Sequence, residues 1–285
     1  MWKLAFVVSA VTVVAQNVLS SEMILWQIGK RDNSYKEFAL SNDFSAYLAT
    51  FPDDVTFHAS EDDPGRSWSS IHPGPADGWA GAKSHRFTII FTLQEEPIGV
   101  YPLIIDLVDT HGSSPPVLEI SVNKESGTAE LPKGTGDESF KDPAAGKEHV
   151  IRLDLPARVL RKGENRIILT NKAGAWLLYD SIVLAHDPDS KPSVGVTKLT
   201  VSPTIRYAAT HPNKQIIEIQ AEFMPGTPPC HAHVRVGDYN MKITLKPPLF
   251  GMIRKEVSIP AVNAPTPAQV SIGDIKTEWV QKPER

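Results

Sequence analysis

Short runs of apolar residues, separated by polar turns, recur along the chain from residue 23 onward. Within many of these runs apolar and polar side chains alternate, which is the period-two pattern of a β-strand with one buried face. Only the stretch 42–49 suggests a helix. About eight strands in about 165 residues predict an all-β sandwich of the jelly-roll type. The predicted strands of this first region are 23–28, 55–59, 86–93, 100–108, 117–122, 148–155, 166–170 and 176–185.

The last of these strands carries one acid on an otherwise apolar face. Because side chains alternate along a strand, Trp176, Asp180 and Leu184 point to the same side. A carboxylate in such a row needs hydrogen-bond donors or a place at an open edge. We therefore expect Asp180 to have a structural role and to hold the sandwich closed.

A domain boundary follows this region, because residues 186–195 have the polar, proline-bearing composition of a linker. Beyond it, about six short strands suit a small immunoglobulin-like or fibronectin-like sandwich. Those strands are 197–202, 215–223, 231–236, 240–245, 255–259 and 269–275, and residues 277–285 are typical of a connector. The predicted division is an export signal at 1–20, the first sandwich at 21–185, the linker at 186–195, the second sandwich at 196–280 and a tail at 281–285.

The first 20 residues have the pattern of an export signal. Lys3 supplies a positive start, residues 4–15 form an uncharged and mostly apolar run, and Val18 and Ser20 are small residues before a cleavage point. The apolar run is shorter than the roughly 20 residues that span a bilayer. We therefore predict a secreted or periplasmic protein with no membrane span after the signal is removed.

Composition excludes several classes of function. The net charge of −4 and the pI near 6.1 give no reason to expect nucleic acid as a partner. A single cysteine, Cys230, excludes an intrachain disulfide framework. The chain contains no Gly-x-Ser-x-Gly, no His-Glu-x-x-His and no glycine-rich phosphate loop. No catalytic residue is therefore predicted.

Two short segments have some features of a metal site. His231 and His233 share one face of a predicted strand, but Cys230 points away from them, and two imidazoles make a poor zinc site. The turn at 61–63 has three consecutive acids, which leaves calcium open as an alternative. We predict no metal and no other cofactor.

The loop at 68–81 combines two tryptophans, an acid and residues that make rigid turns. A sugar site uses an aromatic face for the pyranose ring and a few fixed polar groups for its hydroxyls. Trp68, Asp77 and Trp79 could supply both. The alternative is that the two tryptophans cap the sandwich core.

A second candidate loop begins where the strand at 100–108 ends. Asp109, Thr110 and His111 lie there, and polar groups at strand ends commonly form the rim of a binding face. The alternative is that Asp109 and Thr110 close the turn with local hydrogen bonds. The predicted carbohydrate-binding residues are Asp77, Trp79, Asp109 and His111 as a rim, with Trp68 and Trp176 as stacking platforms.

An ordered set of motifs resembles a known family. The motifs are LWQIGK at 25–30, PGPADGWAG at 73–81, DLVDTHG at 106–112, GEN at 163–165 and WLLYD at 176–180. Together, over about 24–185, they resemble the carboxy-terminal, carbohydrate-binding-like domain of rhamnogalacturonan lyases. The resemblance implies a jelly-roll sandwich of the galactose-binding-like kind. In those lyases a lysine and a histidine of a separate, larger domain perform the β-elimination, and nothing in this sequence matches that domain.

The same sandwich is similar to a module that precedes the catalytic barrel of bacterial α-mannosidase-type glycosidases. There a small sandwich and a Trp-rich lead-in follow, and residues 277–285 resemble that lead-in. We predict an exported, non-catalytic protein that binds a pectin-type polysaccharide or oligosaccharide, with the second sandwich as a spacer or interaction module for a catalytic domain or partner protein. Two alternatives stay open: part of a lyase or glycosidase whose catalytic domain lies outside this sequence, and a packing module that binds no sugar.

Overall fold

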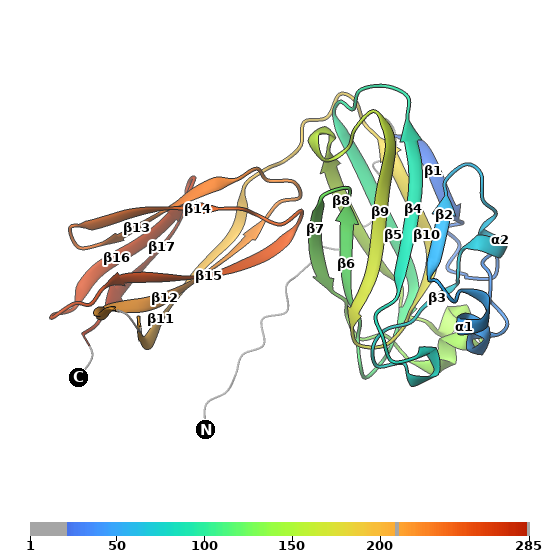
Figure 1. Ribbon diagram of the computed structural model, residues 1–285, viewed down its shortest axis with the longest axis horizontal. Helices are drawn as coiled ribbons and strands as arrows, with labels where there is room; N and C mark the ends of the chain where they lie inside the picture. The colour runs from blue at the N-terminus through green and yellow to red at the C-terminus, as the bar shows by residue number, and fades with distance from the viewer. Residues whose placement is uncertain (1–21, 209–210, 284–285) are drawn as a thin grey trace.

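Two β-sandwiches make up the protein (Figure 1). The structure is a computed structural model that describes residues 22–208 and 211–283. The predicted export signal at 1–20 therefore lies outside the described residues. The last strand of the first sandwich, β10 (Leu177–His186), is followed by the first strand of the second, β11 (Val196–Ala208). Among the described residues, no helix is long and apolar enough to cross a membrane.

The first sandwich is a jelly roll of two sheets. One sheet contains β1 (Met23–Gly29), β3 (Ile71–His72), β5 (Val100–Thr110), β8 (His149–Pro156) and β10; the other contains β2 (Val55–His58), β4 (Arg86–Leu93), β6 (Val117–Val122), β7 (Glu125–Glu130) and β9 (Gly163–Ala173). Their orders are β1-β10-β5-β8, with β3 paired to β10, and β2-β4-β9-β6-β7. Most connections cross from one sheet to the other, as in a jelly roll. The prediction of an all-β sandwich is confirmed.

The core lies between the two sheets because alternate residues of each strand point inward. In β4 the buried residues are Phe87, Ile89 and Phe91, while their neighbours along the strand are half-buried or exposed. Each large apolar side chain buried in this way stabilises the fold by about 1.5–3 kcal/mol. The helices are single turns at the edge of this core, α1 (Tyr47–Thr50) and α2 (Pro64–Ser67).

Two strands of the first sandwich were not predicted from the sequence. β3 is only two residues long, and β7 has the largely polar sequence ESGTAE, which lacks apolar alternation. β7 forms because it pairs with β6 through a two-residue turn whose Asn123 has a φ of 53°. Asparagine is favoured in such hairpin turns because it tolerates a positive φ.

The second sandwich packs three strands against four. Its strands are β11, β12 (His211–Phe223), β13 (Cys230–Val236), β14 (Tyr239–Leu245), β15 (Gly251–Pro260), β16 (Thr266–Ile272) and β17 (Ile275–Gln281). The sheet orders are β11-β12-β15 and β14-β13-β16-β17, all antiparallel. Its core is a separate apolar cluster that includes Ile217, Ile219 and Val270.

The segment expected to be a connector from residue 277 onward is, through Gln281, an edge strand of this sandwich. The Thr277 hydroxyl donates to the Leu199 carbonyl oxygen (2.8 Å), and the buried Gln281 side chain donates to Oε1 of Gln215 (2.5 Å). The inward residues of β17 are a mixture of apolar and polar types, which is why the alternation was not visible in the sequence.

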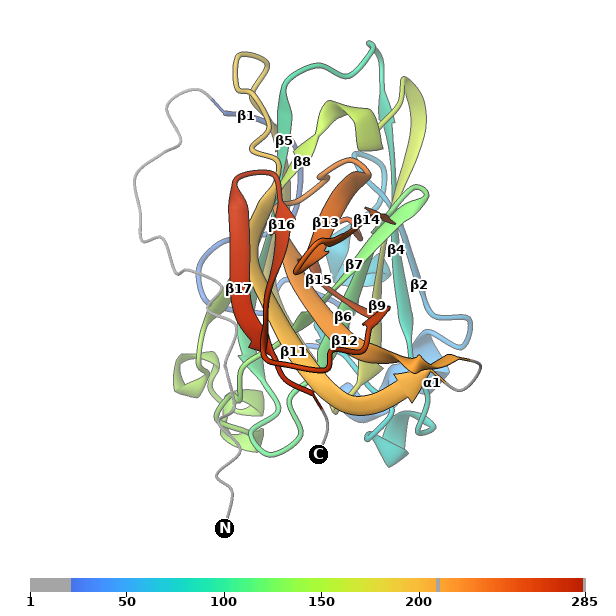
Figure 2. The ribbon, with the colours of Figure 1, turned by 90° about the vertical axis from the view of Figure 1, so that its left-hand side faces the viewer.

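The two sandwiches also touch directly, at the edge strand β7 (Figure 2). Leu249, in the loop before β15, donates its backbone N–H to the Ser126 carbonyl oxygen (2.7 Å). Leu249 and Phe250 belong to the apolar cluster of the first sandwich. A Cβ added to Gly127 would lie 2.4 Å from the Phe250 ring, so glycine is needed for this approach. The second sandwich thereby covers a sheet edge that would otherwise offer unpaired backbone groups.

Candidate functional site

Three loops meet at one end of the first sandwich, the lower end in Figure 1, after strands β3, β5 and β9. Backbone hydrogen bonds join them: Ala76 donates to the Gly174 carbonyl (2.9 Å), and Ala175 donates to the Ser114 carbonyl (2.9 Å). A Cβ on Gly74 would lie 2.5 Å from the Gly174 oxygen, so only glycine permits this approach. The loops therefore form one connected surface.

Trp79 projects from this surface on a single 3-10 turn, Gly78–Ala80. Its side chain is 40% exposed, yet its indole Nε1 donates to Asp77 Oδ1 (3.2 Å). The other carboxylate oxygen, Oδ2 of Asp77, accepts the backbone N–H of Gly74 (2.8 Å). Asp77 is buried and both of its oxygens serve the loop, so its role is to orient the Trp79 ring.

The pKa of Asp77 is raised above its ordinary value, because burial outweighs the favourable contacts of its carboxylate. Burial raises the pKa of its carboxyl group, while the hydrogen bonds from Gly74 and Trp79 and the charges of His111 and His85 act to lower that pKa. The interaction with His111 links this loop electrostatically to the loop after β5. Asp77, Trp79 and His111, three of the predicted rim residues, therefore belong to one loop cluster.

His111 is held by its own turn and by Trp176. Its Nδ1 accepts backbone N–H groups of Ser114 (3.0 Å) and Ser113 (3.3 Å), and its ring meets Trp176 edge-on at 5.5 Å. Trp176 is only 2% exposed and packs against Phe140 at 4.5 Å. Its faces are occupied, so Trp176 supports the His111 ring and is not placed to stack on a sugar.

Trp68, the second predicted platform, is in the core. It has no exposed surface and makes edge contacts with Phe57, Phe87 and Tyr179 at 5.2–5.9 Å between ring centroids. A stacking role needs a free ring face, and this side chain has none. The alternative that the sequence left open, a tryptophan that caps the core, describes Trp68.

Asp109, predicted on the binding rim, is fully buried as well. Its Oδ1 accepts the backbone N–H groups of Thr135 (3.0 Å) and Lys147 (3.2 Å), and its Oδ2 accepts the Thr135 hydroxyl (2.5 Å). These bonds fasten the long loop between β7 and β8 to the end of β5. Asp109 is thus a structural acid, since a buried carboxylate must be paired with donors.

No pattern in the sequence singled out His85, which lies under the Trp79 turn. His85 is fully buried, with Nδ1 2.8 Å from Asp54 Oδ1 and Nε2 2.8 Å from the Ala80 carbonyl oxygen. Leu48, 38% exposed, borders the same turn, 3.9 Å from the position that a Cβ on Gly81 would take. Asp54 and Leu48 come from other segments of the chain, so no local motif could reveal this grouping.

Asp180 has the structural role that its position in the strand predicted. Its Oδ1 accepts backbone N–H groups of Ser34 (3.0 Å) and Asp32 (3.2 Å). These bonds tie the segment after β1 to β10. Asp180 lies away from the loop cluster, at an irregularity in the pairing of β10 with β5.

A second buried acid, Asp106, lies near Asp180. The negative charge of its carboxylate is less completely compensated by neighbouring groups. Arg31 approaches it, with Nε 2.8 Å from Asp106 Oδ2. Burial, together with the charges of Asp180 and Glu148, nevertheless raises the pKa of Asp106 to about 7. We therefore expect the stability of the first sandwich to depend on pH through Asp106.

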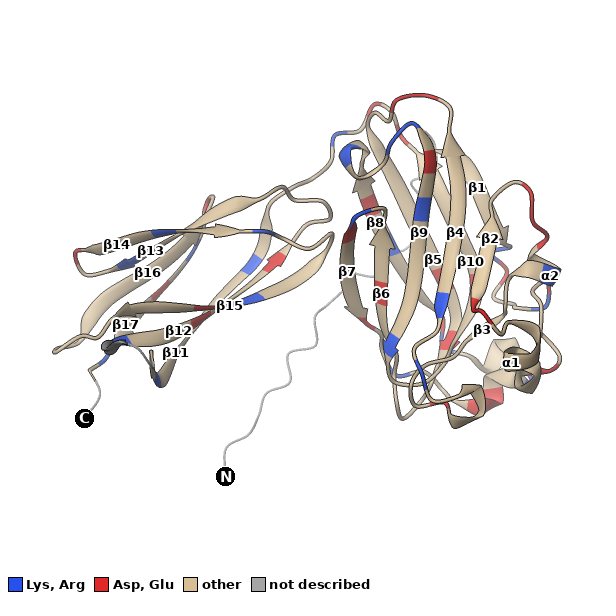
Figure 3. Ribbon diagram, viewed as in Figure 1, with Lys and Arg blue, Asp and Glu red and all other residues tan. Residues whose placement is uncertain are grey.

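The residues that raised the question of a metal have other partners. Asp63 caps α2 by accepting the Gly65 N–H (3.0 Å), and Asp62 accepts the His58 N–H (2.6 Å). Within the described part of the chain, no group of three or more His, Cys, Asp or Glu side chains is placed to hold a metal ion. Charged residues of both signs are interspersed over both sandwiches (Figure 3).

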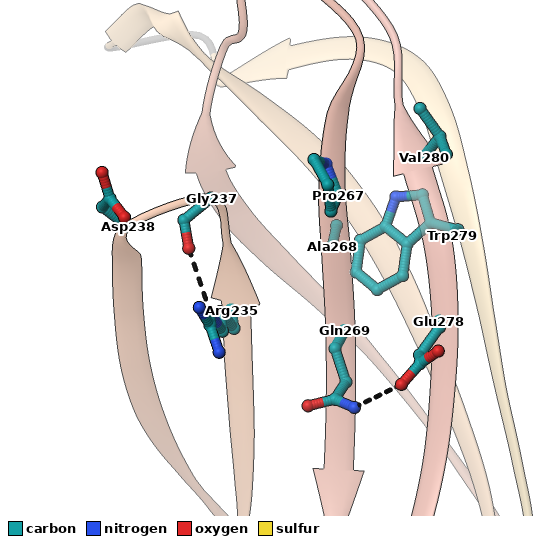
Figure 4. Close-up of a pocket in the computed structure, with 9 residues that line it drawn as sticks. All are labelled: Arg235, Gly237, Asp238, Pro267, Ala268, Gln269, Glu278, Trp279 and Val280. Carbon is teal, nitrogen blue, oxygen red and sulfur yellow. Dashed lines mark hydrogen bonds between the residues drawn. The ribbon is translucent and has the colours of Figure 1, made fainter.

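A separate hollow of about 670 Å³ lies on the second sandwich (Figure 4). Trp279, Arg235 and Glu278 are among its lining residues, and Gln269 donates from Nε2 to Glu278 Oε1 (2.8 Å). The Trp279 indole is half-buried and donates to Gln281 Oε1 (2.8 Å). This hollow comes from β13, β16 and β17 and is independent of the loop cluster.

Comparison with solved structures finds glycosidases of low similarity. Bifidobacterium dentium beta-glucuronidase is 8% identical, with a TM-score of 0.24, over 69% of this chain and 39% of that chain. A GH2 beta-galacturonidase from Eisenbergiella tayi is 9% identical, with a TM-score of 0.22, over 70% of this chain and 35% of that chain. This chain thus spans between a third and two fifths of the length of these enzymes. A search of curated proteins found no match.

A family model gives the decisive comparison. Residues 24–184 match the model described as "CBM-like: Polysaccharide lyase family 4, domain III". The matched segment is the first sandwich almost from end to end, and it contains all three loops of the cluster. Because the match covers more than half of the chain, the protein belongs to the family of the CBM-like domain III of polysaccharide lyase family 4.

Proposed function

We propose that the first sandwich binds a polysaccharide or oligosaccharide at the loop cluster, with Trp79 as the stacking platform. The observation that carries this proposal is an indole that is 40% exposed and yet fixed by its hydrogen bond to Asp77. The apolar face of a tryptophan suits the C–H face of a pyranose. A ring that is already fixed loses little conformational entropy when the sugar binds.

His111 supplies the polar part of the proposed site. Two backbone donors occupy its Nδ1, so the hydrogen of a neutral imidazole is at Nε2 and can be donated to a sugar hydroxyl. Asp77, whose oxygens are already bonded within the loop, acts by positioning Trp79. The proposed contact residues are therefore Trp79 and His111, a smaller set than the sequence predicted.

Membership in the family of CBM-like lyase domains supports a pectin-type polysaccharide as the ligand. In this proposal the protein is exported, through the signal at 1–20, to a secreted or periplasmic location. It holds the polysaccharide without cleaving it, and a catalytic domain or partner protein performs the reaction. The loop cluster offers a platform and a donor, which are the requirements for binding.

Calorimetric titration with rhamnogalacturonan and homogalacturonan oligosaccharides tests the proposal. We expect Trp79→Ala to weaken binding about five- to 150-fold, because stacking on an aromatic ring is worth about 1–3 kcal/mol in comparable contacts. The matched control is Ile98→Ala, which removes an exposed apolar side chain, 58% exposed, from the loop at the other end of the same sandwich. The melting temperature of both variants should stay close to that of the wild type.

Three results would contradict the proposal. Absence of binding across pectic and mannose-containing glycans would remove the carbohydrate function. Binding that survives Trp79→Ala but is lost in Gln269→Ala would move the site to the hollow of the second sandwich. Formation of an unsaturated product, seen by its ultraviolet absorbance on incubation with rhamnogalacturonan, would show that the chain is itself a lyase.

A further inference from the structure

The side chain of His85 connects the core of the first sandwich to the turn that carries Trp79. Its Nδ1 lies 2.8 Å from Asp54 Oδ1 and its Nε2 lies 2.8 Å from the carbonyl oxygen of Ala80, the last residue of that turn. Carboxylate and carbonyl oxygens only accept hydrogen bonds, so both ring nitrogens must donate. A histidine that donates from both nitrogens is an imidazolium.

We infer that His85 is a buried imidazolium that positions the Trp79 turn, and that the sugar affinity of the loop cluster depends on its second proton. The inference rests on the proposed function for its effect on affinity, but not for the state of His85 itself. His85 is a positioning residue here, because it has no exposed surface and acts through the Ala80 backbone.

The contact with Ala80 ties the turn to the core, whereas the bonds from Gly81 to the Gly78 carbonyl (3.1 Å) and from Ala82 to the Asp77 carbonyl (3.0 Å) lie within the turn itself. Ala80 is fully buried and donates its N–H to the Asp77 carbonyl (3.1 Å). Its own carbonyl oxygen takes the hydrogen of His85 Nε2. A buried carbonyl without a donor is unfavourable, so loss of this bond should let the turn move toward water. Trp79 lies in the middle of that turn and would move with it.

Asp54, the other hydrogen-bond partner of His85, has an unfavourable backbone conformation. Its φ is 66°, in the left-handed region that residues with a side chain rarely adopt. Such a conformation persists when surrounding contacts require it. The ion pair with His85 at 2.8 Å is one such contact, and the bond from the Asp54 N–H to the Phe51 carbonyl (3.3 Å) is another.

The direction of the pH effect follows from the unequal strength of the two acceptors. A hydrogen bond to a charged carboxylate is stronger than one to a neutral carbonyl. When His85 loses one proton, the remaining hydrogen therefore stays at Nδ1 with Asp54, and Ala80 loses its donor. Rising pH should loosen the Trp79 turn and weaken sugar binding.

The groups that face His85 leave this direction unchanged. The pKa of His72 is lowered to about 3 by burial, so His72 is neutral; its Nε2 donates to the His85 carbonyl (2.9 Å) and its Nδ1 accepts from Tyr179 (2.8 Å). Tyr47 meets the His85 ring edge-on at 4.8 Å, and burial raises the pKa of its hydroxyl. The charged groups near His85 are then Asp54 and, farther off, Asp77, both of which favour the imidazolium.

Nuclear magnetic resonance of protein labelled with 15N-histidine tests the inference without any ligand. We expect both ring nitrogens of His85 to carry hydrogen while the Trp79 turn has the position that the structure shows. When raised pH removes one of these hydrogens, the indole N–H resonance of Trp79, which reports the bond to Asp77, should shift with the same midpoint. Sugar affinity, measured in parallel, should fall about three- to tenfold across that transition, as expected for the loss of one hydrogen bond.

Two variants make the test specific. Asp54→Asn keeps an oxygen acceptor but removes the charge, so both midpoints should move to lower pH. His58→Gln is the matched control, because His58 forms an exposed pair with Asp62 (3.2 Å) and should leave both midpoints unchanged. If Asp54→Asn does not fold, the wild-type titration still decides the inference.

The outcomes separate this inference from the proposed function. A His85 ring with a single hydrogen at every pH, or one that titrates without moving the Trp79 resonance, would overturn the inference. A coupled titration of His85 and Trp79 in a protein that binds no glycan would sustain the positioning role and reject the carbohydrate function.

Discussion

The two sandwiches of this protein use similar strands but differ in what they bury. The first buries ionisable side chains, among them His72, His85, Asp106, Asp109 and Asp180. In the second, the buried polar side chains among the described residues are the neutral Gln215, Thr227 and Gln281. Buried charge is costly unless it is paired, so it is retained where it organises something. In the first sandwich, buried side chains such as His85 and Asp109 hold loops in place. The second sandwich has a more ordinary apolar core.

The two sandwiches also differ in the lengths of the loops that join their strands. In the first sandwich Asp109 anchors the long loop between β7 and β8, and Asp77 organises the turn of Trp79. In the second sandwich most strands are joined by short turns, such as the two-residue turn Gly237–Asp238. Loops built on a rigid scaffold are the usual place for binding residues. The comparison therefore supports the proposal that the first sandwich carries the binding site and that the second has a supporting role.

Among the substitutions that test this comparison, Trp68→Ala should have the largest effect on stability. The side chain is fully buried among three aromatic rings, so its removal should lower the free energy of unfolding of the first sandwich by about 3–5 kcal/mol. Hydrogen exchange resolved by strand should show faster exchange in β4 with little change in β12. Trp79→Ala is the matched control and should cost only about 1 kcal/mol, for the loss of its hydrogen bond to Asp77. Equal loss of protection in both sandwiches would mean that they unfold as one unit.

Asp106→Asn should change how the stability of the first sandwich depends on pH. The pKa of Asp106 is raised to about 7 in the folded protein, so the folded state binds a proton that the unfolded chain releases near its ordinary value of 3.8. The stabilisation present at low pH is therefore lost as the pH rises toward and through about 7. Denaturant unfolding of the wild type should lose about 2–4 kcal/mol more than the variant between about pH 4 and pH 8. Parallel curves for the two proteins would show that Arg31 already compensates the charge.

Phe250→Ala should have the smallest of the three effects on stability, but it addresses how the two halves are joined. Phe250 is 8% exposed and packs on Gly127 of β7, at the contact between the sandwiches. Its removal should cost about 1–3 kcal/mol, less than for a residue in a domain interior. Small-angle X-ray scattering should detect a more extended average shape. Met252→Ala, two residues further along the chain in β15 and exposed, is the control. An unchanged scattering profile would show that the linker and Arg158, which donates to the Gly226 carbonyl (3.0 Å), suffice.

Sequence alone located most strands of both sandwiches, because half-buried strands alternate in polarity. It placed β4 and β6 at their observed bounds and found β10 to within one residue at each end. Besides the two-residue β3, it missed β7 and β17, whose polarity does not alternate clearly. Those two strands form because a neighbouring strand supplies their hydrogen bonds, which is information that no local pattern contains.

The candidate site was predicted only in part, for a related reason. Trp68 and Trp79 have similar surroundings in the sequence, but one is fully buried and the other is 40% exposed. Asp77 precedes the Gly78–Ala80 turn and Asp109 lies at the end of β5, and each accepts hydrogen bonds from its own or a distant loop. Residue type indicated which chemistry was available near these loops, but not which groups remain accessible.

The class of fold, the family and the loops that could carry a function can be derived from the amino-acid sequence, because these depend on local alternation and on ordered motifs. Which residues form the site depends on the tertiary structure. It set Trp79 outside and Trp68 inside, gave Asp77 its positioning role, and brought Asp54 and His85 together beneath the Trp79 turn. Burial and hydrogen-bond partnership depend on segments far apart in the chain, and only the folded structure brings those segments into contact.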